Sequence, residues 1–294
     1  MRVLITGCHG LLGQKLVALV PDHVDVFGID LQEESPILPQ PSFSKCDITD
    51  RQQVLEHVLK LAPDWIINAA AYTNVDGAEK ERRLCWKVNV EAVENLAYAA
   101  RKVHSKIVHI STDYIFDGKD GPYDENAVPN PLGYYGRSKL AGENALRVSS
   151  VEYIIIRTMI LYGKNIFGNA NFVTWLIEKL RQKQKVRIVT DQIGNTTLAD
   201  ELAGGIWKTI GTDYRGVLNI AGREILDRLT FARQVAQVFE LDQSLITPIT
   251  TDALNQAAPR PLNSGLLVDK AINEFHLELS DAKEGLVKLK EQFN

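Results

Sequence analysis

The stretch Val3-Leu-Ile-Thr-Gly-Cys-His-Gly-Leu-Leu-Gly13 indicates the fold of the chain. Residues 3–6 are typical of a buried strand, and three glycines with an apolar, helically spaced pattern follow them. A strand, a glycine turn and a helix in this order are the context of a dinucleotide site, because the turn lets backbone approach a pyrophosphate at the helix N-terminus. The spacing is G-x-x-G-x-x-G, so a tight structural turn would also fit it.

A second predicted strand, residues 24–30, ends at Asp30. This acid lies about 20 residues past the middle of the turn, where a carboxylate can accept the ribose hydroxyls of adenosine. The alternative is an exposed loop acid. Residues 31–34 contain two glutamates and no Lys or Arg. A 2′-phosphate would meet carboxylates there, so the sequence favours NADH, with NADPH as the alternative.

Two further strand ends fit a cofactor. Residues 44–48 indicate the end of a third strand, where Asp47 can reach an adenine amino group or simply precede the helix predicted over residues 51–61. Asp50 is a suitable cap for that helix. Residues 64–71 predict a fourth strand and its exit, where Ala70 and Ala71 are small enough for a cofactor to pass closely.

The candidate chemistry lies between residues 106 and 139. A buried strand, residues 106–112, ends at Thr112, a polar loop follows, and Pro131 is expected to open a helix that carries Tyr135 and Lys139. Residues four apart share a helix face. The pattern suits proton transfer to a carbonyl oxygen, with Tyr135 as acid, Lys139 favouring the phenolate and holding the nicotinamide ribose, and Thr112 aligning the carbonyl.

Tyr-x-x-x-Lys is a weak string, and the chain contains a second copy at Tyr98 and Lys102. That copy sits near the end of a helix predicted over residues 84–104, just before the strand of residues 106–112 begins. It is therefore expected at the opposite edge of the sheet, as a solvated pair.

Composition excludes several classes of function. The chain has 294 residues and a formal net charge of -4, without a run of basic residues, which argues against a nucleic-acid partner. Its apolar runs are shorter than the ~20 residues needed to span a membrane. Cys8, Cys46 and Cys85 lack zinc spacing, so no metal site is expected. Unpaired thiols and the lack of a signal peptide favour a cytoplasmic protein.

Strands and helices alternate up to about residue 158, and the pattern then becomes irregular. This predicts an α/β fold with a doubly wound parallel (Rossmann) sheet in residues 1–158. Residues 159–294 are expected to form a smaller C-terminal substrate-binding lobe, with some of their strands and helices returning to the sheet.

Taken together, six motifs resemble those of the extended short-chain dehydrogenases/reductases, and within them the dTDP-4-dehydrorhamnose reductases. They cover residues 7–13, 68–79, 111–118, 135–143, 191–194 and 260–264. The resemblance implies NADH- or NADPH-dependent reduction of the 4-keto group of a dTDP-4-keto-6-deoxy sugar, as in the formation of dTDP-L-rhamnose. It leaves a homodimer as one candidate state.

The resemblance also implies roles for single residues. The catalytic set would be Thr112, Tyr135 and Lys139. The cofactor would be lined by Gly7, Gly10, Leu11, Leu12, Gly13, Asp30, Asp47, Ile48, Ala70, Ala71, Tyr135 and Lys139. The nucleotide-sugar would be held by Thr112, Asp113, Ile160, Asn171, Arg260 and Asn263.

Two departures put the particular sugar in doubt. Members of the family commonly carry Arg-Thr-Ser-Trp after the sixth strand, with the Trp facing the sugar, where this chain has Arg157-Thr-Met-Ile160. Thr196 stands where the family usually has Pro.

Three other functions would fit the same fold. A nucleotide-sugar dehydratase needs an acid where this chain has Tyr114, and an epimerase would share the same scaffold. A non-catalytic regulatory subunit, such as the β subunit of methionine adenosyltransferase, shares the fold too, but intact Thr112, Tyr135 and Lys139 favour catalysis.

Overall fold

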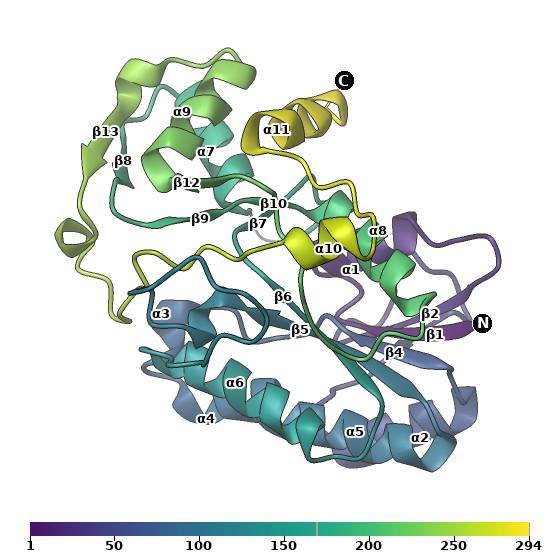
Figure 1. Cartoon of the computed structure of the whole chain (residues 1–294). Helices are drawn as coiled ribbons and strands as arrows, with labels where there is room; N and C mark the ends of the chain where they lie inside the picture. The colour runs from purple at the N-terminus through teal and green to yellow at the C-terminus, as the bar shows by residue number, and fades with distance from the viewer. Residues whose placement is uncertain (169, 294) are drawn as a thin grey trace.

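The computed structural model describes residues 1–168 and 170–293. A seven-stranded sheet lies at its centre, and each neighbouring pair of strands is parallel (Figure 1). In spatial order the strands are β11 (Gly216–Asn219), β6 (Tyr153–Thr158), β5 (Lys106–Thr112), β4 (Trp65–Asn68), β1 (Arg2–Thr6), β2 (Asp25–Asp30) and β3 (Phe43–Lys45). The order reverses between β1 and β4, and ligands of open parallel sheets bind in the crevice at such a switch point. The predicted doubly wound sheet is confirmed.

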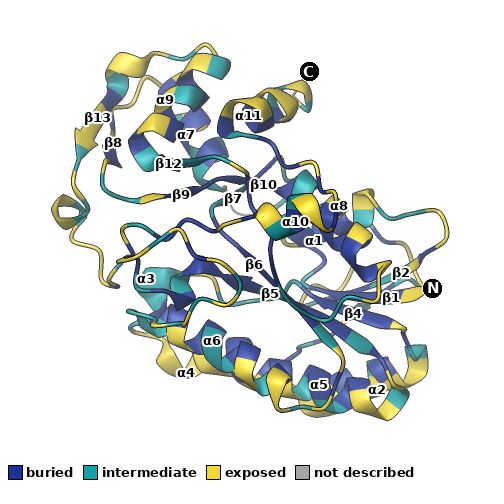
Figure 2. Cartoon of the chain, in the orientation of Figure 1, coloured by how far each residue is buried: buried dark blue, intermediate teal, exposed yellow. Residues whose placement is uncertain are grey.

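Helices cover both faces of the sheet (Figure 1). One face carries α1 (Leu11–Ala18), α8 (Ala199–Ile210) and α10 (Asp269–Asn273), and the other carries α2 (Arg51–Leu61), α5 (Ala92–Val103) and α6 (Tyr134–Arg147). Strand residues alternate between the faces: Val3 and Ile5 pack in the first core, and Leu4 packs in the second. Because both faces are covered, the central strands are apolar along their length, and Figure 2 shows them buried.

The remaining elements form a smaller lobe with a core of its own. Its helices are α7 (Phe172–Arg181), α9 (Arg228–Val238) and α11 (Ala282–Glu291), and its strand pairs are β7 (Leu161–Tyr162) with β10 (Thr197–Leu198), β8 (Val186–Val189) with β13 (Ile246–Ile249), and β9 (Ile193–Asn195) with β12 (Ile225–Asp227). Because β11 and α8 lie after residue 158 yet pack in the sheet layer, the chain returns from the lobe. The domain boundary at residue 158 stays a prediction.

The helix predicted over residues 84–104 is three segments. They are α4 (Arg82–Trp86), a π-helical turn η1 (Lys87–Glu91) and α5. Asn89 lies in the π turn, where its Oδ1 accepts from Tyr72 N at 2.9 Å and its Nδ2 donates to Ser138 Oγ at 2.9 Å. Such turns are frequent at functional sites, and here the turn places a buried amide against the helix that carries Tyr135.

The prediction that Pro131 opens the next helix is wrong. Helix α6 begins at Tyr134, with Gly133 as its N-cap. The Glu79 carboxylate, at the end of α3 (Val75–Ala78), accepts a 2.6 Å hydrogen bond from Tyr134 N. A residue distant in sequence therefore satisfies the first turn of the helix and determines where it starts.

The remaining short elements are the 3-10 turns η2 (Asp113–Ile115), η3 (Gln243–Leu245) and η4 (Thr251–Leu254). Within residues 1–168 and 170–293, no helix combines the length and apolar character needed to cross a membrane.

Candidate active site

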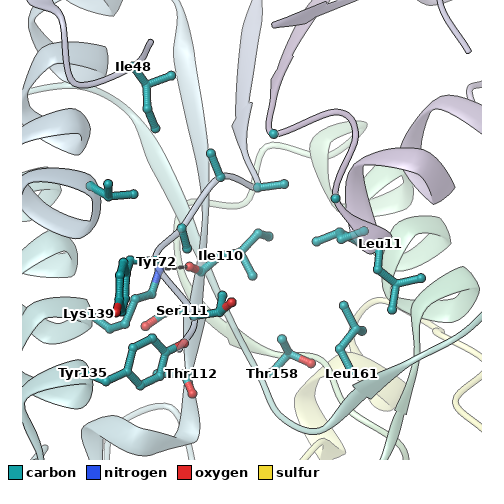
Figure 3. A pocket seen from close by; sticks show the side chains of 18 of the residues that line it. Leu11, Ile48, Tyr72, Ile110, Ser111, Thr112, Tyr135, Lys139, Thr158 and Leu161 are labelled. Atoms are coloured by element: carbon teal, nitrogen blue, oxygen red, sulfur yellow. Dashed lines mark hydrogen bonds between the residues drawn. The ribbon is translucent and has the colours of Figure 1, made fainter. Parts of the chain in front are cut away.

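A cavity of about 800 Å³ opens at the carboxyl ends of the central strands, at the point where the strand order reverses. Its lining comes from the glycine turn, from the ends of β2, β4, β5 and β6, and from α6 (Figure 3). Every residue predicted to contact the cofactor lines it except Gly13, which packs inside the turn. The sequence-based cofactor set is thus brought together in one place.

The glycine turn is packed so closely that side chains would not fit in it. Gly7 has a φ of +66°, and a Cβ there would lie 2.8 Å from Ala70 N. A Cβ at Gly13 would lie 2.2 Å from Gly7 O. Gly10 caps α1 through its backbone alone, and Leu11 and Leu12 line the cavity. The turn therefore presents bare backbone at a helix N-terminus, which fits a dinucleotide pyrophosphate.

At the β2 end, Asp30 is held by backbone groups. Its Oδ2 accepts from His9 N at 2.9 Å and its Oδ1 accepts from Leu31 N at 2.8 Å. Sequence reasoning missed a cation at this corner, because it considered only the residues that follow Asp30. Lys45 on β3 is paired with Asp30 in the parallel register, and its ammonium forms an ion pair with exposed Glu33.

The Asp47 carboxylate is partly used within its own turn, since it accepts from the backbone N and the Oγ1 of Thr49. Near Asp30, the Cys8 thiol and a ring nitrogen of His9 come within 4.8 Å of the Asp30 carboxylate. Burial raises the pKa of Cys8 to about 12, and the His9 ring nitrogens contact Gln32 and Ser35. These contacts fix the turn, and we assign the group no metal.

Thr112, Tyr135 and Lys139 meet at one end of the cavity (Figure 3). Burial raises the pKa of Tyr135 and Asp113 adds to that rise, whereas the interaction with the Thr112 side chain opposes it. Burial lowers the pKa of Lys139 to about 8, although the electrostatic interactions with Glu143 and Cys85 raise it. Lys139 Nζ donates to Ile110 O at 2.5 Å. The phenol is therefore protonated near neutral pH, as a proton donor requires.

Asp113 lies beside this set but is engaged within the protein. Its Oδ1 accepts from Thr112 Oγ1 at 3.0 Å, and its Oδ2 accepts from Ser264 Oγ at 2.6 Å. Burial raises the pKa of Asp113 to about 6, although both hydrogen bonds lower it. The carboxylate thus fixes the Thr112 side chain at the edge of the cavity.

The second Tyr-x-x-x-Lys copy lies elsewhere. Tyr98 and Lys102 are on α5, and the Arg51 guanidinium of α2 lies 3.8 Å from the centre of the Tyr98 ring. Neither residue is among the described residues that line the cavity. This placement agrees with the predicted solvated pair.

The substrate-side predictions divide into two groups. Ile160 lines the cavity, with a φ of 43° that is a conformational outlier for a β-branched residue. Asn171 instead caps α7 and donates to Gly163 O, Arg260 forms an ion pair with Asp76, and Asn263 donates to Gly121 O. These three are not among the described residues that line the cavity, and their contact with substrate stays a prediction.

Sequence reasoning also missed Arg228, the first residue of α9. Its guanidinium lies 4.9 Å from the Phe172 ring and interacts electrostatically with Asp113 and Tyr114. The Arg260 guanidinium lies 6.0 Å from the centre of the Tyr114 ring. Two guanidinium groups therefore lie near Tyr114, which lines the cavity. A lone Arg after a short strand belongs to no motif, so only the fold reveals it.

Comparisons with known proteins agree on one family. The model of the RmlD substrate binding domain family matches residues 1–294. The chain is 35% identical to the dTDP-4-dehydrorhamnose reductase of Aggregatibacter actinomycetemcomitans, over 98% of each protein. It is 30% identical to a probable low-salt glycan biosynthesis reductase of Haloferax volcanii, over 100% of this chain and 99% of that protein.

A solved structure is similar over the same length. The dTDP-4-dehydrorhamnose reductase of Bacillus anthracis, crystallised in complex with NADP, superposes with a TM-score of 0.90 at 34% identity, covering 99% of each chain.

Proposed function

The chain belongs to the dTDP-4-dehydrorhamnose reductase family, and from this premise we propose that it reduces the 4-keto group of a dTDP-4-keto-6-deoxy sugar with NADH or NADPH. The proposed substrate is dTDP-4-dehydrorhamnose and the product dTDP-L-rhamnose. One observation carries the proposal: Thr112, Tyr135 and Lys139 meet in a cavity that also contains the glycine turn.

The proposed roles follow from the positions of the side chains. When bound, the reduced nicotinamide supplies a hydride to the ketone carbon. Tyr135 donates a proton to the ketone oxygen, which its raised pKa permits because the phenol is protonated at neutral pH. Thr112, held by Asp113, aligns that oxygen. Lys139 lies one helical turn from Tyr135 and holds the nicotinamide ribose beside it.

Arg228 and Arg260 are proposed to bind the diphosphate of the nucleotide-sugar. Both are cationic side chains of the proposed substrate lobe and interact with Tyr114, which lines the cavity. The planar guanidinium group matches phosphate oxygens in a bidentate arrangement. Arg260 would bind while keeping its contact with Asp76.

Two broader attributes are also proposed. Cys8, Cys46 and Cys85 are free buried thiols, which suits a reducing compartment and supports a cytoplasmic location. We further propose a homodimer, which light scattering of the purified protein will test.

Oxidation of NADH in the presence of a panel of dTDP-4-keto-6-deoxy sugars tests the function. We expect turnover that requires the sugar, with the alcohol product identified by mass spectrometry. Binding of the cofactor without turnover of any sugar in the panel would contradict the reductase assignment and favour a regulatory subunit of the same fold.

A further inference from the structure

A row of buried polar side chains crosses the sheet and ends at Lys139. Thr6 Oγ1 on β1 donates to Asn68 Oδ1 on β4 at 2.7 Å, and Asn68 Nδ2 lies 3.1 Å from His109 Nδ1 on β5. His109 Nε2 then lies 3.5 Å from Lys139 Nζ. None of the four residues is more than 2% exposed. The row therefore connects the middle of the sheet to the proposed active site without solvent.

His109 is kept neutral in this row. Burial lowers its pKa well below the ordinary value, and the charge of Lys139 adds to that effect. A neutral imidazole has one nitrogen that donates and one that accepts. What His109 offers to Lys139 is therefore determined by what Asn68 offers to His109.

The hydrogen bonds from Asn68 through His109 to Lys139 can run in two directions. With the Asn68 NH2 toward His109, Nδ1 accepts and the Nε2 proton faces Lys139, whose neutral amine has a lone pair to accept it. With the amide reversed, Nδ1 donates to the Asn68 oxygen and Nε2 accepts from the Lys139 ammonium. In that direction Asn68 donates to Thr6 Oγ1, which also accepts from Ala70 N at 3.4 Å, and the Thr6 hydroxyl turns its own proton away from Asn68. Each charge state of Lys139 thus has a matching arrangement of the row.

We propose that His109, oriented by Asn68 and Thr6, is a positioning residue that pairs with Lys139 in both its charged and its neutral form and so determines the pH range in which Lys139 supports reduction. The second half of this inference rests on the proposed reductase function, whereas the pairing itself does not. The proton that Lys139 releases leaves through the cavity, and the row only reorients.

Three other titratable groups lie near Lys139. Glu143 and Tyr135 share its helix, and Cys85 approaches from α4. Glu143 is occupied by Arg157 and Arg147, and burial raises the pKa of Cys85. Burial lowers the pKa of Lys139 to about 8, so its charge changes in an accessible range. A buried group that changes charge is costly wherever one form lacks a partner.

The pairing can be tested without turnover. In the wild-type protein labelled with 15N-histidine, the His109 signal is identified by its loss in His109→Gln. We expect the His109 proton to move between Nδ1 and Nε2 as pH passes about 8, with the ring never charged, and the step to vanish in Lys139→Met. A single tautomer at every pH, or an ordinary histidine titration, would overturn the proposal.

The kinetic consequence has a definite sign. His109→Phe removes the hydrogen-bond partner of Lys139. The charged ammonium loses more stabilisation than the neutral amine, because hydrogen bonds to charged groups are stronger. The pKa of Lys139 then falls, and the alkaline limb of kcat moves down by about one pH unit. His109→Gln keeps both a donor and an acceptor, so the alkaline limb of kcat in this variant should stay close to its wild-type position.

Thermal melting first establishes that both variants are folded, and their pH profiles of kcat then test whether His109 positions Lys139. A loss that is equal at every pH would mean a merely structural residue and overturn the proposal, as would an unchanged profile. If the wild-type enzyme reduces no sugar, the NMR step still tests the pairing, so failure of the proposed function and failure of this inference are distinguishable.

Discussion

Ser264 Oγ donates a 2.6 Å hydrogen bond to Asp113 Oδ2, and this contact joins the end of β5 to the segment that follows Arg260. The same carboxylate accepts from Thr112. The C-terminal part of the chain is thereby tied to a proposed catalytic side chain.

Ser264→Ala is expected to raise the pKa of Asp113. Burial already raises it to about 6, and the Ser264 hydrogen bond lowers it, so removing that bond favours the protonated acid. A protonated Asp113 holds Thr112 less firmly, and the acid limb of kcat/KM should move up by about one pH unit. The pH profile checks this, with Ser264→Thr as the control that keeps a hydroxyl. An unmoved limb would show that Asp113 does not orient Thr112.

The wild-type protein is expected to bind NADH more tightly than NADPH. Asp30 lines the cavity, and Lys45, its register partner on β3, is paired with Glu33. Glu33→Gln removes that partner and leaves Lys45 free for a 2′-phosphate, so NADPH affinity should rise about two- to fivefold while NADH affinity stays nearly constant. Fluorescence titration of both cofactors gives the two affinities.

Glu34→Gln is the matched control for that experiment, since Glu34 is a neighbouring exposed carboxylate that forms no ion pair with residues 1–168 or 170–293. It removes one negative charge but releases no lysine. Equal gains in the two variants would attribute the effect to net charge rather than to Lys45.

The buried ion pair behind the site is expected to matter for stability. Arg157 donates to both carboxylate oxygens of Glu143, at 3.1 and 3.0 Å, and both side chains are almost fully buried. Glu143→Gln leaves the Arg157 charge without its counterion, which should cost about 3–5 kcal/mol of unfolding free energy in urea denaturation. Glu152→Gln, at an exposed ion pair, should cost less than about 1 kcal/mol.

The pH dependence of the same pair has a definite sign. Burial alone would raise the pKa of Glu143, but the Arg157 guanidinium and the Ser111 hydroxyl outweigh it and hold the pKa below the ordinary glutamate value. Its contribution to stability is therefore present above the unfolded pKa and is lost as pH falls through the lowered folded pKa. A pH dependence that is identical in wild type and Glu143→Gln would contradict this assignment.

Much of the fold could be predicted from local sequence patterns. The strand, glycine turn and helix at the N-terminus follow from side-chain size and periodicity, and helix α2 begins right after its predicted cap, Asp50. The start of α6 did not follow, because Glu79 satisfies its first turn from another element. Short-range patterns contain no signal for such a contact.

Site residues could be predicted from the sequence where a single helix or strand carries them. Tyr135 and Lys139 share a helix, whereas Lys45 reaches the Asp30 corner only through strand pairing. Arg228 approaches Asp113 and Tyr114 only because the lobe that carries α9 packs beside the site. His109 did have a signal, since it is a histidine between apolar neighbours in β5, but its partners are on β4 and α6.

Ile160→Trp tests which sugar fits the cavity. Ile160 lines the cavity with a strained backbone, and strain of this kind is often found at functional sites. Trp would add a flat face and an N–H donor, and pairing an otherwise unpaired sugar hydroxyl is worth about 1–3 kcal/mol. We expect kcat/KM for dTDP-4-dehydrorhamnose to rise about five- to hundredfold. A folded variant with unchanged kinetics would mean that Ile160 only packs beneath the lobe.

The most direct test of the account is hydride transfer in Tyr135→Phe, followed as loss of reduced nicotinamide absorbance in a single turnover with dTDP-4-dehydrorhamnose. Losing the proton donor should slow the step by about 10²–10⁴-fold, while NADH binding stays nearly unchanged. Tyr98→Phe, the matched control on α5, should match the wild type. Wild-type rates in Tyr135→Phe, or equal losses in both variants, would contradict the assignment of Tyr135 as the acid.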